Sequence, residues 1–218
     1  MSGGHTTPPG VFLTGTDTGI GKTLVAACLV RALGARYWKP VQTGLASEPG
    51  DSETVQALAG LSVERLIPPR FALQAPLSPL AAAEREGVTI RLEDFELPPI
   101  DSAPLVVEGA GGVLVPLCAD ALMVDLMVRF GLPVLVVARS TLGTLNHTLL
   151  TLEALRHRGL PVAGVILNGP PNPGNRAALE RFGAVRVLAE LPPLPRVDAA
   201  AVAGFAAAHS PLFEMLLS

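Results

Sequence analysis

Short apolar runs alternate along the chain with longer segments in which apolar residues recur at helical spacing. The apolar runs are rich in Val, Ile and Leu, which predicts buried strands. The predicted strands are 10–15, 36–40, 103–109, 133–138, 161–169 and 185–191, with a short extended piece at 113–117. The predicted helices are 22–34, 51–60, 78–86, 121–131, 144–159, 175–183 and 198–217, and the proline-rich stretch 66–80 is predicted to be a loop. This alternation is typical of an α/β fold with a mostly parallel central sheet and helices on both faces.

No repeat or linker interrupts the pattern, so the sequence predicts a single domain over 1–218 with a loose tail at 1–9. The apolar runs are shorter than the roughly 20 residues that a membrane span needs, and the first residues lack a signal-peptide pattern. A net charge of -3 gives no basic surface for nucleic acid. Cys28 and Cys118 lie in apolar segments and are predicted to be reduced core residues. We therefore expect a cytoplasmic protein that binds neither nucleic acid nor a membrane.

Only two of the 16 basic residues are lysines, Lys22 and Lys39, and the others are arginines. A mutational bias toward Arg explains this if the two lysines are chance survivors. Both lysines fall in the most motif-like stretches of the chain, however, where a compact ammonium on a flexible stem differs in use from a planar guanidinium. The distribution favours a functional role for both.

The stretch "GTDTGIGKT" at 15–23 lies between a predicted strand and a predicted helix, which is the context of a phosphate-binding loop. Backbone N–H groups of such a loop and the N-terminus of the helix bind phosphate. Lys22 is expected to reach the β- and γ-phosphates, and Thr23 to offer its hydroxyl to Mg²⁺. Gly15 and Gly21 enclose five residues rather than the usual four. The alternative is a glycine-rich turn without a ligand.

Two other strand ends carry chemically useful side chains, and in parallel sheets ligands bind at this edge. Lys39 precedes Pro40 in "KPVQTG", where it can face an anion above the phosphate loop or be a solvated loop lysine, and Thr43 can donate a hydrogen bond. Glu108 follows four apolar residues, so its carboxylate either binds a metal or is paired. Asp51 opens a helix as an N-cap or as a second metal ligand.

Asn168 ends the strand at 161–169 and can read a nucleotide base or simply form a turn with Gly169. The four histidines have no metal-ligand spacing.

The stretches "TGTDTGIGKT", "KPVQTG", "VEGAGG", "LGTLNHTLLT" and "AGVILN" together resemble the dethiobiotin synthetases of biotin biosynthesis, in the same order along residues 12–168. The five-residue spacing in the loop is that family's own form. The resemblance implies a P-loop NTPase-like fold with three layers, a homodimer with active sites near the subunit interface, and ATP, Mg²⁺, 7,8-diaminopelargonic acid and CO₂ (or bicarbonate) as ligands. It implies carboxylation and ring closure to dethiobiotin, through a carbamate and a carbamic–phosphoric anhydride.

The resemblance also implies roles for individual residues. The catalytic lysines are Lys39 and Lys22, and the metal ligands are Thr23, Asp51 and Glu108, with Glu53 as a rival to Asp51. The nucleotide-binding residues are Gly19, Ile20, Gly21, Lys22, Thr23, Leu24, Asp51, Glu108, Gly109, Ala110, Gly111, Asn168, Gly169, Pro192, Pro193 and Leu194. The substrate-binding residues are Thr18, Thr43, Gly143, Thr144, Leu145 and Asn146.

Two other functions use related motifs. An ATP-dependent amide ligase of the cobyrinic acid synthetase kind needs a glutamine-hydrolysing domain, for which 218 residues leave no room. A P-loop ATPase switch that positions proteins or plasmids carries a lysine near the start of its loop, and 15–20 contains none.

Overall fold

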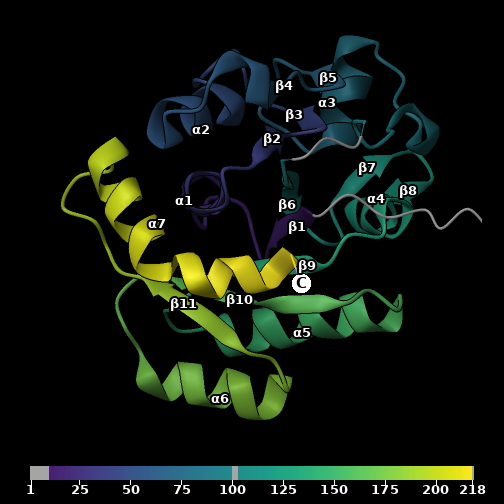
Figure 1. The fold of residues 1–218 in the computed structure, drawn as a ribbon. Coiled ribbons are helices and arrows are strands. Elements are labelled where there is room, and N and C mark those ends of the chain that lie inside the picture. Colours follow the sequence, from purple (N-terminus) through teal and green to yellow (C-terminus); the bar gives the residue numbers. More distant parts are fainter. Residues whose placement is uncertain (1–9, 100–102, 218) are drawn as a thin grey trace, which may run out of the picture.

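A seven-stranded parallel sheet forms the centre of the protein (Figure 1). The computed structural model describes residues 10–99 and 103–217, so the predicted tail at 1–9 lies outside the described residues. The strand order is β11 (Val187–Leu191), β10 (Val162–Asn168), β9 (Val134–Arg139), β1 (Gly10–Gly15), β6 (Leu105–Gly112), β2 (Arg36–Trp38) and β4 (Leu66–Ile67). Each neighbouring pair is parallel. The predicted parallel sheet is confirmed, and β1 lies at its middle.

Helices cover both faces of this sheet and complete the three predicted layers (Figure 1). The helices α1 (Lys22–Leu33), α2 (Asp51–Ala59) and α7 (Ala199–Glu214) contribute to one buried apolar cluster. The cluster on the other face takes residues from α3 (Pro79–Glu86), α4 (Met123–Phe130), α5 (Thr144–His157) and α6 (Pro173–Gly183). Cys28 and Cys118 are buried free thiols, as predicted.

Several short elements differ from the prediction. The stretch 66–80 holds β4 at the edge of the sheet and β5 (Phe71–Ala72), which pairs with β3 (Val41–Gln42). The predicted helix at 121–131 begins as β8 (Ala121–Leu122), which pairs with β7 (Pro116–Cys118). A strand of two residues is too short to show a periodic sequence pattern. It becomes a strand only through its pairing in the tertiary structure. Single 3₁₀ turns occupy Val63–Arg65, Leu92–Asp94 and Met215–Leu217.

The last helix is unusually apolar. Within the described residues, Ala199–Leu217 is the one helical stretch whose length and composition would suit a membrane span, with a mean hydropathy of 1.4. Its buried residues Val202, Ala206 and Phe213 face inward, and the helix packs against α1 and α2. Only 22% of that apolar window is buried, so this packing accounts for part of its composition.

Candidate active site

The loop between β1 and α1 places Lys22 at the N-terminus of α1. The Lys22 ammonium donates to the backbone oxygen of Asp17 at 2.8 Å, so the side chain lies over its own loop. Burial, followed by the nearby charge of Lys39, lowers the pKa of Lys22 to about 8. An anionic ligand at this position would therefore relieve a buried and poorly solvated ammonium.

Two glycines give this loop its shape. Gly19 and Gly21 have φ values of 70° and 91°, which side chains with a Cβ rarely adopt. A Cβ at Gly21 would also collide with the side-chain amide of Asn168. That amide donates from Nδ2 to the Ile20 oxygen at 2.8 Å and ties the loop to the end of β10. Asn168 thus lies beside the loop, as the prediction of a nucleotide contact requires.

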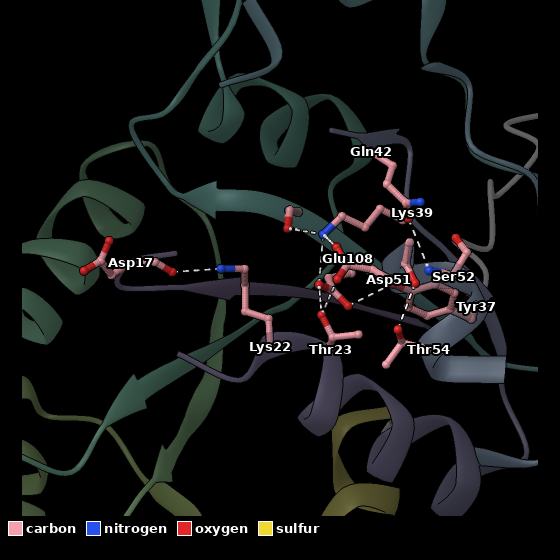
Figure 2. Close-up of polar contacts among 12 residues, drawn as sticks. Asp17, Lys22, Thr23, Tyr37, Lys39, Gln42, Asp51, Ser52, Thr54 and Glu108 are labelled. Carbon is pink, nitrogen blue, oxygen red and sulfur yellow. Dashed lines mark hydrogen bonds and ion pairs between the residues drawn. The ribbon is translucent and has the colours of Figure 1, made fainter. Parts of the chain in front are cut away.

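A second group of side chains meets beside α1, where β2, β6 and α2 converge (Figure 2). Lys39 follows β2, and its Nζ lies 2.5 Å from Asp51 Oδ2 and 2.9 Å from Glu108 Oε1. The Thr23 hydroxyl lies 2.7 Å from Asp51 Oδ1 and 3.1 Å from Glu108 Oε1. The structure therefore brings together four side chains, Thr23, Lys39, Asp51 and Glu108, that the sequence places far apart.

Burial shifts the pKa values of the charged side chains in this cluster. Glu108 is 1% exposed and Lys39 is 4% exposed. Burial lowers the pKa of Lys39, but the charges of Glu108 and Asp51 more than offset this effect, so the net shift is upward. Burial opposes ionisation of Asp51, yet Lys39 and the Thr23 hydrogen bond hold the pKa of Asp51 below its usual value. Lys39 and Asp51 are therefore both charged at neutral pH.

The donor set fits Mg²⁺. Its members are oxygens, and Mg²⁺ in nucleotide sites takes one or two carboxylates while phosphate and water supply the remaining ligands. The Lys39 ammonium lies between the same two carboxylates, which shows that the position attracts positive charge. Among the described residues, no group of three or more His, Cys, Asp or Glu side chains is arranged to hold a metal, so a cation here would need ligand oxygens from a substrate. Asp51, rather than Glu53, contacts Thr23 and Lys39.

The other residues predicted around the triphosphate lie next to these two groups. Glu108, Gly109, Ala110 and Gly111 belong to the end of β6, which runs beside β1. The Lys39 ammonium lies 3.4 Å from the Gly109 oxygen. A Cβ at Gly111 would lie 3.5 Å from the Thr18 hydroxyl, so Thr18 and β6 face each other. Thr43 directly follows β3 and is half-buried.

A pocket of about 260 Å³ opens at the ends of β9 and β10, lined by Gly19, Ile20, Arg139, Thr141 and Asn168. The sequence reasoning missed Arg139 and Thr141. Arg139 Nη2 pairs with the Asp17 carboxylate at 2.8 Å. Its position directly after the predicted strand at 133–138 was the available signal. Pro192, Pro193 and Leu194 follow β11, while the Gly169 N–H donates to the Leu191 oxygen and holds the ends of β10 and β11 together.

The start of α5 contains the remaining predicted substrate residues. Gly143 caps the helix with a φ of 94°. The Thr144 N–H donates to the Thr141 oxygen, and the Thr144 hydroxyl bonds with that of Thr148. The N–H and hydroxyl groups of Thr144 therefore already have partners within the chain. The backbone N–H groups of Leu145 and Asn146 are the better candidates for binding a ligand. Leu142 in the preceding loop is fully exposed.

Curated proteins and solved structures resemble this chain. The "Biotin biosynthesis bifunctional protein BioCD" of Bordetella avium is 60% identical over 195 residues, which are 89% of this chain and 42% of that protein. The "ATP-dependent dethiobiotin synthetase BioD" of Paramagnetospirillum magneticum is 56% identical over 89% of this chain and 93% of that protein. The synthetase of the same name from Agrobacterium fabrum is 47% identical over 94% and 95% of the two chains. This chain therefore spans less than half of the bifunctional relative but nearly all of the synthetases.

A family model described as an AAA domain matches residues 9–201. A ParA family ATPase from Chlorobium tepidum superposes with a TM-score of 0.54 at 13% identity, covering 93% of this chain and 99% of that one. A putative plasmid partition protein from Borrelia burgdorferi gives 0.55 at 10% identity, covering 96% and 97%. At these identities the likeness shows the fold alone.

The parallel sheet and the Gly-Lys-Thr loop at the end of its middle strand define a P-loop NTPase-like protein. The high identity to curated synthetases over almost their whole length is more specific. The chain belongs to the ATP-dependent dethiobiotin synthetase family.

Proposed function

We propose that this chain uses ATP and Mg²⁺ to carboxylate 7,8-diaminopelargonic acid and close the ureido ring of dethiobiotin. The observation that carries the proposal is the convergence of Lys39 with Thr23, Asp51 and Glu108 beside the loop that holds Lys22. The chain acts as one domain, as a homodimer and in the cytoplasm.

The reaction has three steps. One amine of the diamine adds to CO₂ and loses a proton, which gives a carbamate. A carbamate oxygen attacks the γ-phosphorus of ATP, the bond to the bridging oxygen breaks, and ADP leaves. The second amine then attacks the carbonyl carbon of this anhydride and closes the ring. Phosphate leaves with the former carbamate oxygen, and the amine proton passes to solvent or to phosphate.

The two lysines neutralise negative charge at different places in the active site. Carbamate and triphosphate repel each other, so positive charge must lie between them. Lys22, at the N-terminus of α1, holds the β- and γ-phosphates. Lys39 turns from the carboxylates of Asp51 and Glu108 toward the carbamate and the transferring phosphoryl group. Thr23, Asp51 and Glu108 would hold Mg²⁺, which would neutralise charge on the phosphate oxygens.

The remaining residues position the substrates. Thr18 and Thr43 contact the diamine. The backbone N–H groups of Gly143, Leu145 and Asn146 at the start of α5 hold its terminal carboxylate, with Thr144 beside them, since a helix N-terminus favours negative charge. Asn168 reads adenine beside the pocket at Gly19 and Ile20, with Gly169 beside it and Pro192 to Leu194 as a cover.

The test is to incubate the purified protein with ATP, Mg²⁺, bicarbonate and the diamine, and to measure dethiobiotin and phosphate. We expect one phosphate for each dethiobiotin and no phosphate release without the diamine. An ATPase switch would instead hydrolyse ATP without the diamine, and an amide ligase would require ammonia or glutamine. Either result would refute the proposal.

A further inference from the structure

Tyr37 is the only tyrosine in the chain, and it is fully buried on β2. Its hydroxyl donates to Glu108 Oε2 at 2.9 Å. A phenol packed among apolar residues needs a partner for its O–H group, but an apolar Phe would fill the same space without that need. The hydroxyl of Tyr37 binds Glu108, which is a proposed metal ligand, and this partner suggests a role beyond packing.

The sheet register explains how the two side chains meet. Tyr37 pairs with Val106 across the β2–β6 ladder. Side chains two residues apart on a strand share a face, so Glu108 projects from the same face as Val106, one step further toward the active site. Lys39 is likewise two residues beyond Tyr37. Glu108 thus lies between Tyr37 and Lys39, whereas Trp38 belongs to the core on the opposite face.

The two oxygens of Glu108 have different partners. Oε1 lies 2.9 Å from the Lys39 ammonium and 3.1 Å from the Thr23 hydroxyl, at the edge where substrates bind. Oε2 points into the core and receives the Tyr37 hydrogen bond (Figure 2). Because burial and the charge of Glu108 hold the pKa of Tyr37 well above its usual value, the hydroxyl keeps its proton and remains a donor.

We propose that Tyr37 is a positioning residue for the metal ligand Glu108: its hydroxyl fixes Oε2, so that Oε1 is presented to the divalent cation. This inference rests on the proposed function, in which Glu108 binds Mg²⁺. Partners of this kind orient the ligating group, and their loss costs about 10- to 100-fold in metal affinity. Without the hydroxyl, a buried carboxylate oxygen has lost its donor, and the carboxylate can rotate away from Thr23.

The experiment measures Mn²⁺ binding to the full chain with a non-hydrolysable ATP analogue, by the electron paramagnetic resonance of free Mn²⁺. Tyr37→Phe should raise the Mn²⁺ dissociation constant about 10-fold or more. Its affinity for the analogue in EDTA should be unchanged. In turnover, the Mg²⁺ concentration needed for half-maximal rate should rise by the same factor.

The matched control is Trp38→Phe. This variant also loses a hydrogen bond from β2, the partly buried one from Nε1 to the Pro68 oxygen at 3.2 Å, but its side chain lies on the face away from Glu108. Its Mn²⁺ affinity should equal that of the unmodified protein even if its melting temperature falls. Equal Mn²⁺ affinity of folded Tyr37→Phe and the unmodified protein would show that the hydroxyl is only a satisfied core group. Absence of Mn²⁺ binding by the unmodified protein would instead refute the metal site itself, and this inference with it.

Fluorine labelling of Tyr37 tests the proposal even if Tyr37→Phe does not fold. Because Tyr37 is the single tyrosine, growth on 3-fluorotyrosine places one fluorine label beside its hydroxyl without removing the hydrogen bond. Coordination of Mg²⁺ at Oε1 draws charge from the carboxylate that the hydroxyl contacts. The single ¹⁹F resonance should therefore move when Mg²⁺ is added with the ATP analogue. A resonance that stays in place while the metal binds would overturn the proposal.

Discussion

Replacing Lys39 by Met tests the charge balance of the active site. The Lys39 ammonium lies 2.5 Å from Asp51 Oδ2 and 2.9 Å from Glu108 Oε1. At an effective dielectric constant of about 20, each attraction amounts to about 6 kcal/mol, which the desolvation of the buried charges partly offsets. Removing one partner of such a group typically costs about 3–5 kcal/mol, because it leaves charge buried without compensation. Asp51 is 35% exposed, so we expect a value near the lower end.

The assay is thermal unfolding at pH 7.5 in EDTA, followed by titration with Mg²⁺ in the presence of a non-hydrolysable ATP analogue. A loss of about 3 kcal/mol lowers the melting temperature of a chain of this size by about 6–12 °C. Mg²⁺ should then restore more stability to Lys39→Met than it adds to the unmodified protein, since the cation takes the place of the ammonium. The control Arg70→Met breaks an exposed pair at 4.0 Å and should change little. A melting temperature of Lys39→Met that is unchanged in EDTA and insensitive to Mg²⁺ would refute the reasoning.

Three other predictions concern turnover, the phosphate loop and a buried thiol. Lys39→Ala should abolish dethiobiotin formation but still bind an ATP analogue by calorimetry; near-normal turnover would remove Lys39 from the mechanism. Gly21→Ala should weaken binding of the analogue at least about 10-fold, because Gly21 has a φ of 91° and a Cβ there collides with Asn168. Gly87→Ala, with a φ of 67° and open space around its Cβ, should lose stability only. Burial raises the pKa of the Cys28 thiol from 9.0 to about 12. The unfolded chain therefore releases this proton first, and stability should fall above pH 9, by about 1.4 kcal/mol at pH 10. Urea unfolding of Cys28→Ala should lack this part of the pH dependence, and identical profiles would contradict the assignment.

The sequence predicted the central sheet and its helices because each long strand is a continuous apolar run and glycines such as Gly34 and Gly60 mark helix ends. It did not predict β4 or β5, whose two residues each become strands only through pairing with β2 and β3. The motifs identified Lys22, Thr23, Lys39 and Glu108 because these residues end strands or open a helix.

The contacts between these residues could not be predicted from the sequence. Spacing could not decide between Asp51 and Glu53, because the choice depends on how α2 docks against α1. Tyr37 and Arg139 were missed for a similar reason. Their partners, Glu108 and Asp17, lie on other strands or loops. The local sequence pattern does not predict the strand order that brings these residues together.

The most direct test of the central claim follows oxygen from CO₂ into phosphate. In a single turnover with C¹⁸O₂, ATP and the diamine, mass spectrometry of the released phosphate reports whether a carbamate oxygen attacked the γ-phosphorus. The account predicts one ¹⁸O atom in each phosphate formed with dethiobiotin. Phosphate that carries only unlabelled oxygen, released alongside dethiobiotin, would contradict it.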